Sequence, residues 1–331
     1  MFGSRRPADL KAVRSAGAAA SAAAITPSAE SVLQRIEWTV LRRLDGLLHG
    51  NYRTLFRGFG IDLADLREYQ VTDDARTIDW NATARLQLPY VRQFNEERDL
   101  TAWFLVDLSG SVNFGGGATT KRAKAVEFVA LLARLLTRHG NRVGAVLYTD
   151  RVEVVLPARG GRHHVLHLID RMLRTGQARR RGKFTRLGEL LHRALQTIKR
   201  RSVVFVLSDF ISDPGWTREL FLLGQRHDVV AVRLYDALEM ALPDLGQVTV
   251  EDAETGQQLF VDTHDAVFRR RFSSLAAERE TVLRAGLSDA GADCIELSTE
   301  GDLVDTVMRF TRLRKRRAQL ASGGVPPALI Q

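Results

Sequence analysis

Residues 106–111 read Val-Asp-Leu-Ser-Gly-Ser and directly follow an apolar run that is typical of a buried strand. This order places three oxygen-bearing side chains, Asp107, Ser109 and Ser111, on one tight turn. A carboxylate and two hydroxyls are hard ligands that suit a small divalent cation, Mg²⁺ or Mn²⁺, in an octahedral oxygen shell with open positions. The turn therefore predicts a metal site. The alternative is that the three side chains only cap the turn and the helix that follows.

Two residues farther along the chain are candidates for the same site. Asp209 follows a later apolar strand, and Thr185 lies in a loop before a predicted helix. In open α/β sheets, ligands bind at the carboxyl ends of the strands, near the point where the strand order reverses. We therefore expect one cation to be held by five residues: Asp107, Ser109, Ser111, Thr185 and Asp209.

The elements that must position these residues alternate regularly from residue 100 onward. Strand patterns cover 103–107, 143–148, 152–156, 202–207, 229–234 and 293–297. Helical patterns cover 120–139, 163–173, 187–200, 215–227, 264–289 and 301–317. Such alternation predicts an α/β fold with a doubly wound, mostly parallel, Rossmann-like sheet and helices on both faces. The strands at 143–148 and 152–156 are expected to pair as a hairpin, and a second hairpin is inserted near 246–262.

The rest of the chain divides by composition. We expect a disordered tail at 1–30, an N-terminal helix with a small β-rich module at 31–99, the α/β domain at 100–318 and a flexible tail at 319–331. Apolar residues at helical spacing predict the N-terminal helix over 32–49, with Ser31 as its N-cap. In the module, Trp80 is expected to be a buried anchor within a network of charged hydrogen bonds.

Composition limits the classes of protein that the chain can be. It has 331 residues and a net charge of +9, which favours an acidic partner such as a protein face, nucleic acid or anionic lipid, or reflects an arginine-rich proteome. The single cysteine, Cys294, excludes an internal disulfide and is expected to be buried in a strand. No stretch approaches the ~18 apolar residues of a membrane span. We expect a cytoplasmic protein, with a weak twin-arginine-like export signal at the N-terminus as the alternative.

The pattern of the five candidate ligands resembles the metal-ion-dependent adhesion site of von Willebrand factor A domains. That family carries Asp-x-Ser-x-Ser on its first loop, which Asp107, Ser109 and Ser111 match. It carries a Thr on the second loop and an Asp on the third, which Thr185 and Asp209 match. The Thr loop is often glycine-rich in the family, whereas residues 181–186 here read Arg-Gly-Lys-Phe-Thr-Arg. The resemblance implies a cation whose open position takes a carboxylate from a partner protein.

The upstream module carries a second resemblance. It reads Gly-Ile-Asp-Leu at 60–63, Arg-Glu-Tyr at 67–69, Asp-Asp-Ala-Arg-Thr-Ile-Asp-Trp at 73–80 and Thr-Ala-Arg at 83–85. This resembles the bacterial domain-of-unknown-function family 58, which joins such a segment to a von Willebrand A-like domain. The resemblance covers roughly residues 50–310. It implies a MoxR-type AAA+ ATPase as partner and a role in the chaperone-like maturation of other proteins.

Three functions compete at this point, and we expect a non-enzymatic, metal-dependent interaction module. A basic run over 174–186 adjoins Thr185 and would attract an acidic partner, or is a solvated loop. RNA binding is the first alternative, although few aromatic residues interleave with the basic runs. A magnesium-dependent phosphotransferase with Asp107 as nucleophile is the second. An aspartyl phosphatase would carry a second Asp two residues on, where this chain has Ser109.

Overall fold

A computed structural model describes most of the α/β domain and parts of the N-terminal region. The described residues are 13–14, 28–37, 65–70, 78, 80, 83–84, 88–93, 100–117, 119–176, 186–213, 215–251 and 257–321.

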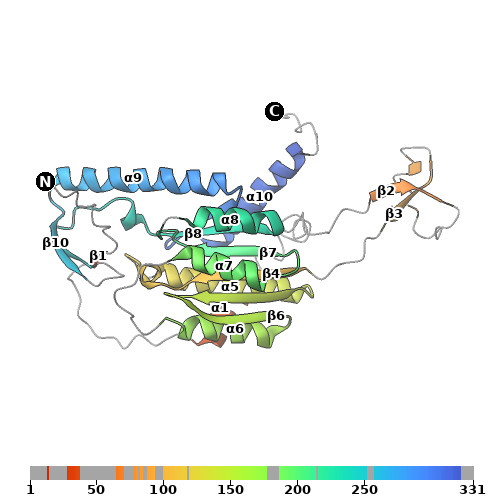
Figure 1. Cartoon of the computed structure of the whole chain (residues 1–331), viewed down its shortest axis with the longest axis horizontal. Coiled ribbons are helices and arrows are strands. Elements are labelled where there is room, and N and C mark those ends of the chain that lie inside the picture. Colours follow the sequence, from red (N-terminus) through yellow and green to blue (C-terminus); the bar gives the residue numbers. More distant parts are fainter. Residues whose placement is uncertain are drawn as a thin grey trace.

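A six-stranded sheet forms the centre of the described part of the chain (Figure 1). In chain order its strands are β4 (Thr101–Asp107), β5 (Arg142–Tyr148), β6 (Val152–Arg159), β7 (Val203–Ser208), β8 (Asp228–Tyr235) and β11 (Asp293–Ser298). Across the sheet the order is β11-β8-β7-β4-β5-β6. Five strands run parallel, and β6 pairs antiparallel with β5 as the expected hairpin. The predicted mostly parallel sheet is confirmed.

Helices cover both faces of this sheet, so the strands carry apolar side chains on both faces. In β4, Phe104 and Val106 enter one buried cluster, whereas Trp103 and Leu105 enter the other. The first cluster includes α5 (Lys121–Arg138), α6 (Arg162–Arg174) and α10 (Leu303–Ala321). The second includes α7 (Leu187–Thr197), α8 (Trp216–Arg226) and the end of α9 (Ala266–Asp289). Helix α10 continues into the tail predicted from residue 319.

The strand order reverses at β4. From this strand the chain builds outward through β5 and β6 on one side, and later through β7, β8 and β11 on the other. The carboxyl ends of β4 and β7 therefore flank the reversal point, where side chains from two loops face a shared crevice. These ends carry Asp107 and, directly after β7, Asp209.

The N-terminal helix belongs to the α/β domain rather than to the β-rich module. Helix α1 (Ala29–Ile36) contacts α5 and α6, and its residues Val32, Leu33 and Ile36 join the first buried cluster. Its N-cap is Ser28, whose hydroxyl accepts a hydrogen bond from the Ser31 amide, so the expected cap at Ser31 was wrong. Residues 38–49 of the predicted helix lie outside the described residues.

A hairpin lies beside the amino-terminal end of α9 (Figure 1). Strands β9 (Gln247–Glu251) and β10 (Gln258–Asp262) pair antiparallel, which confirms the hairpin expected near 246–262. Val248 and Val261 pack with Phe272 of α9 in a small cluster of their own. The short strand β1 (Val13–Arg14) pairs with β9, although it falls within the predicted disordered tail.

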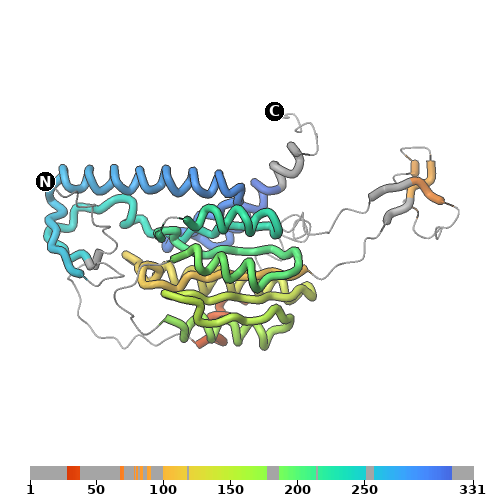
Figure 2. Tube along the Cα trace, in the orientation of Figure 1, coloured from red at the N-terminus to blue at the C-terminus, as the bar shows by residue number. Residues whose placement is uncertain are grey.

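A separate two-stranded sheet represents the β-rich module among the described residues. Strands β2 (Asp65–Glu68) and β3 (Tyr90–Gln93) pair antiparallel with each other and form a sheet separate from the six-stranded one. Figure 2 follows the Cα trace of the six-stranded sheet and its helices in the same orientation as Figure 1. Trp80 is 71 % exposed, so the prediction of a buried anchor was wrong. No buried cluster of the described residues includes Trp80. The acidic residues of the 73–80 segment, which were expected to form the charged network, lie outside the described residues.

Cys294 corrects another expectation. It lies in β11 as predicted, but its side chain is exposed. Side chains alternate along a strand, and in β11 Ile295 and Leu297 take the buried face. In the part of the chain that the structure describes, no helix is long and apolar enough to cross a membrane.

Candidate metal centre

The turn after β4 buries all three of its candidate ligands. Asp107 is fully buried, and its Oδ1 accepts a 2.9 Å hydrogen bond from the Ser109 amide. The short helix η3 (Gly110–Asn113) follows, and the Ser109 hydroxyl makes no capping bond to it. The Asp107 carboxylate therefore stabilises the turn, whereas capping does not account for the Ser109 hydroxyl.

The two serine hydroxyls point at each other. Ser109 Oγ and Ser111 Oγ lie 3.1 Å apart in a buried position. Adjacent oxygen ligands of an octahedral Mg²⁺, each at 2.0–2.1 Å from the ion, would lie about 2.9 Å apart. The hydroxyl spacing therefore fits two neighbouring corners of such a shell.

The loop after β7 supplies the other side of the crevice. Ser208 Oγ donates a 2.8 Å hydrogen bond to Asp107 Oδ2 and accepts one from the Phe210 amide. Asp209 is buried, and its Oδ1 accepts a 3.0 Å bond from the Ile211 amide. Phe210 has a φ of 58°, the left-handed region that non-glycine residues rarely adopt. This backbone conformation lets the Phe210 amide bond to Ser208 and the next amide, that of Ile211, bond to Asp209.

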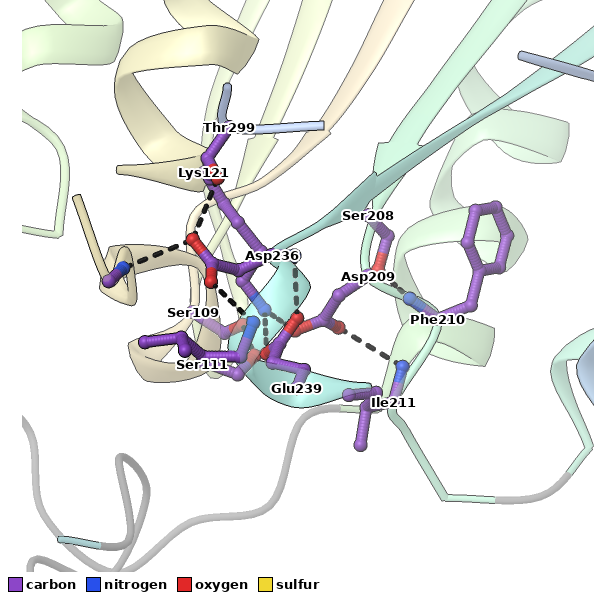
Figure 3. Close-up of polar contacts among 12 residues, drawn as sticks. Ser109, Ser111, Lys121, Ser208, Asp209, Phe210, Ile211, Asp236, Glu239 and Thr299 are labelled. Carbon is purple, nitrogen blue, oxygen red and sulfur yellow. Dashed lines mark hydrogen bonds and ion pairs between the residues drawn. The ribbon is translucent and has the colours of Figure 1, made fainter. Parts of the chain in front are cut away.

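A lysine that the sequence did not single out lies in the same cluster. Lys121 is 0 % exposed, and its Nζ lies 2.9 Å from Asp209 Oδ2 and 2.6 Å from Glu239 Oε1 (Figure 3). It is the first residue of α5, directly after the N-cap Thr120. A cation at a helix N-terminus is opposed by the helix dipole, and this position is the signal that could have indicated a special role.

The charges of this cluster shift one another. Burial and the neighbouring Asp209 raise the pKa of Asp107 to about 6, against hydrogen bonds from Ser109 and Ser208. Burial alone would raise the pKa of Asp209 as well, but the Lys121 ammonium outweighs it and lowers that pKa below its usual range.

The second partner of Lys121 shows the opposite balance. Burial raises the pKa of Glu239 despite the attraction of Lys121. Burial would lower the pKa of Lys121, but Asp209 and Glu239 raise it above its usual value. With its three carboxylates ionised, the cluster of Asp107, Asp209, Glu239 and Lys121 carries two net negative charges. Buried charge of this kind is stabilised by a further cation.

A second set of polar contacts joins the cluster to the ends of β8 and β11. Glu239 Oε2 accepts a 3.1 Å hydrogen bond from the Asp236 amide, and Asp236 caps the short helix η4 (Ala237–Glu239). Asp236 Oδ2 also accepts bonds from the Gly116 amide at 3.0 Å and from Thr299 Oγ1 at 2.7 Å (Figure 3). Glu239 therefore connects Lys121 to a turn that joins the ends of β8 and β11 and the loop that contains Gly116.

The structure brings four of the five predicted ligands to one edge: Asp107, Ser109, Ser111 and Asp209. Thr185 lies outside the described residues. The described chain resumes at Arg186, whose amide donates to the Tyr148 hydroxyl, and Tyr148 is the β5 register partner of Asp107.

The donor set fits a hard divalent cation of the magnesium type. Among the residues the structure describes, no three His, Cys, Asp or Glu side chains are grouped as a metal cage. An ion here would therefore depend on Asp107 and Asp209, on the hydroxyls of Ser109 and Ser111, and on water or a partner's oxygen. Their role as ligands stays a prediction.

Comparison with known proteins places the chain among uncharacterised relatives. Residues 65–282 match the family described as protein of unknown function DUF58. The uncharacterized protein Rv1480 of Mycobacterium tuberculosis is 33 % identical over 294 residues, which cover 88 % of this chain and 92 % of that protein. The uncharacterized protein MAV169 of Mycobacterium avium is 32 % identical over 165 residues, 49 % of this chain and 95 % of that protein.

Two solved structures are also similar. The conserved hypothetical protein BatB from Bacteroides thetaiotaomicron is 10 % identical, with a TM-score of 0.41 over 67 % of this chain and 99 % of that one. An aerotolerance-related membrane protein from Bacteroides fragilis is 10 % identical, with a TM-score of 0.42 over 66 % of this chain and 99 % of that one. Likeness at this level carries no inference about function.

Proposed function

The chain belongs to the DUF58 family, and from that premise we propose that it is a metal-dependent protein-interaction module. In this proposal Asp107, Ser109, Ser111 and Asp209 hold one divalent cation, Mg²⁺ or Mn²⁺. The cation would accept a carboxylate from a partner protein at its open position, and no bond is made or broken. The observation that carries the proposal is the pair of serine hydroxyls, 3.1 Å apart beside a buried carboxylate in a cluster with excess negative charge.

The proposal includes a von Willebrand A-like identity for the α/β domain. The strand order β6-β5-β4-β7-β8-β11 supports it, because the candidate ligands follow the two strands at which this order reverses. The Asp-x-Ser-x-Ser turn over 107–111 supports it independently. Thr185 completes the motif in the sequence.

The partner we propose is a MoxR-type AAA+ ATPase, which presents an acidic side chain and acts with this protein in the chaperone-like maturation of other proteins. The family resemblance supports this partner class. The positive charge of the chain supports an acidic contact surface. Two exposed arginines, Arg174 and Arg186, lie at the described ends of the basic run beside the site. A cytoplasmic location is part of the same proposal.

The phosphotransferase alternative is less compatible with the geometry. Both carboxylate oxygens of Asp107 accept hydrogen bonds within the chain, from the Ser109 amide and from Ser208 Oγ. A nucleophilic carboxylate needs an exposed oxygen in line with the phosphorus atom. RNA binding predicts a different result: affinity for unrelated RNA that falls steeply with salt and does not require a metal.

The experiment is a calorimetric titration of Mg²⁺ and Mn²⁺ into the wild type and Asp107→Asn, with Asp150→Asn as the matched control on the β5–β6 turn. We expect one ion per chain in the wild type and in the control, and none in Asp107→Asn, because that change removes the buried charge while preserving the shape. A purified MoxR-type ATPase from the same genome is then added. Metal-independent capture, or equal metal binding by all three proteins, contradicts the proposal.

A further inference from the structure

Lys121 forms a buried ion pair with Asp209, next to the proposed metal site. Its Nζ lies 2.9 Å from Asp209 Oδ2, and both side chains are almost completely buried. Asp209 is also one of the four residues proposed to hold the divalent cation. With a metal ion bound, the same carboxylate would face two cations, one of which is the side chain of a residue in α5.

Two cations that share one carboxylate oppose each other. Like charges a few ångströms apart in a poorly solvated site repel each other strongly. A metal ion that engages Asp209 would therefore weaken the hold of Lys121 on it. Conversely, Lys121 on Asp209 lowers the attraction of the site for a metal ion.

Lys121 has a second carboxylate partner, Glu239, which can keep its ammonium group when the contact with Asp209 is lost. Glu239 Oε1 lies 2.6 Å from Lys121 Nζ, and the Glu239 side chain is 15 % exposed. Its other oxygen, Oε2, accepts the hydrogen bond from the Asp236 amide. Release of Lys121 from Asp209 would therefore change the surroundings and position of the carboxylate that closes the 236–239 turn.

We propose that Lys121 is a tethered cation that competes with the divalent metal for Asp209, and that metal binding releases it from Asp209 and leaves it paired with Glu239 alone. This inference rests on the proposed metal-dependent function and adds its regulation. The metal-bound and metal-free states then differ at the 236–239 turn, which contacts Gly116 and Thr299 through Asp236. Lys121 is a positioning residue in this account, since it touches a ligand of the metal.

A purely structural counter-ion would behave differently. If Lys121 only stabilises Asp209 and Glu239, removing either partner of the cluster disturbs the site, and metal affinity falls in every variant. Competition instead predicts opposite signs for changes at the two ends of the Lys121–Glu239 pair. The signs of the effects therefore separate the two roles.

The test measures Mg²⁺ affinity by calorimetry in the wild type, Lys121→Met, Glu239→Gln and the double variant, with Lys124→Met as control. Lys124 lies one turn along α5 and donates to the Gly301 carbonyl, outside the cluster. We expect Lys121→Met to bind Mg²⁺ about tenfold more tightly or better, since a like charge is removed. Glu239→Gln leaves Lys121 with Asp209 as its only carboxylate in the cluster, and we expect weaker binding. The Glu239→Gln effect should vanish in the Lys121→Met background, whereas a simple charge effect would persist there.

The Mg²⁺ affinities of these variants distinguish failure of the competition from failure of the proposed function. Tighter binding by Lys121→Met than by a wild type that binds one ion supports the competition. Unchanged or weaker binding by a folded Lys121→Met overturns the inference, and the proposed function survives if Asp107→Asn still abolishes binding. If neither the wild type nor Lys121→Met binds metal, both proposals fail.

A second measurement needs no change at Lys121 and remains decisive if that variant does not fold. Hydrogen exchange of the Asp236 and Leu238 amides reports the 236–239 turn directly, because both amides are hydrogen-bonded within it. We expect Mg²⁺ to change their protection in the wild type and to change it less in Glu239→Gln. Identical protection with and without bound Mg²⁺ overturns the proposed release.

Discussion

Ser208 Oγ and Asp107 Oδ2 are joined by a 2.8 Å hydrogen bond between residues that lie 101 positions apart in the chain. The bond connects the carboxyl ends of β4 and β7, the two strands at which the sheet order reverses. It fixes one carboxylate oxygen of Asp107, while the Ser109 amide fixes the other. The orientation of the candidate metal ligand is therefore set by the fold before any ligand binds.

Ser208→Ala should destabilise the protein by about 1–3 kcal/mol, because it leaves a buried carboxylate oxygen without its donor. Urea unfolding measures this loss. Thr197→Ala is the control, since its hydroxyl bonds to the Arg193 carbonyl of its own helix, and a change within about 0.5 kcal/mol is expected there. Equal effects of the two substitutions would contradict the role given to Ser208.

The pH dependence of stability should carry the signature of Asp107. Its pKa is raised from the ordinary 3.8 to about 6, so between these values the folded state binds more protons than the unfolded state. The contribution of Asp107 to stability is therefore largest below pH 4 and falls as the pH rises toward 6. Unfolding of the wild type and Asp107→Asn across pH 4–7 measures how much of the pH dependence comes from this carboxyl together with its repulsion of Asp209. A difference that is independent of pH would contradict it.

Metal binding should show the reverse trend with pH. A proton on Asp107 competes with the cation, so Mg²⁺ affinity should weaken as the pH falls through about 6. Calorimetry at pH 7.5, 6 and 5 checks this. Affinity that is constant over this range would exclude Asp107 as a ligand.

Ser109→Ala and Ser111→Ala should each weaken Mg²⁺ binding by about tenfold or more, since loss of even an outer contact at a metal site costs this much. Ser298→Ala, at the end of β11, is the matched control and should bind as the wild type does. In the absence of metal both variants should lose only about 1–3 kcal/mol of stability, because each breaks the buried hydrogen bond between the two hydroxyls. A large loss of stability with unchanged metal binding would show that these hydroxyls stabilise the turn and do not bind a metal ion.

Leu33→Ala should cost about 2–5 kcal/mol of stability, because the side chain is fully buried against α5 and α6. Gln34→Ala changes an exposed neighbour on the same helix and should have little effect. Cooperative unfolding of the α/β domain at lower urea in Leu33→Ala would confirm that α1 is part of that domain. Unchanged unfolding would place the helix outside it.

The elements could be predicted from the sequence to within a few residues, since their signals are local. Strand β4 was expected over 103–107 and covers Thr101–Asp107, and helix α5 was expected over 120–139 and covers Lys121–Arg138. Ser28 was missed as the cap of α1 because Ser31 carries the same signal, and in the structure it bonds to Ser28 instead. The exposure of Cys294 depends on which face of β11 is covered, and that of Trp80 depends on what packs against its module. The residue type alone does not show either.

The candidate site was predictable only in part for a related reason. Asp107, Ser109 and Ser111 share one turn, so their spacing can be recognised directly. Lys121 contacts Asp209 and Glu239 across 88 and 118 positions, and nothing in the local sequence at any of the three indicates these pairs. Such contacts depend on the strand order, which places the ends of β4, β7 and β8 beside one another.

The most direct test of a metal centre at this edge is a crystal structure grown with Mn²⁺ and measured at a wavelength where manganese scatters anomalously. The account predicts one anomalous peak about 2.1–2.2 Å from Ser109 Oγ and Ser111 Oγ, close to Asp107 and Asp209. It also predicts that Lys121 Nζ has moved out of hydrogen-bond distance of Asp209 Oδ2, which lies 2.9 Å away without metal, while it keeps its contact with Glu239. A crevice without a peak, with Lys121 still on Asp209, would contradict the account.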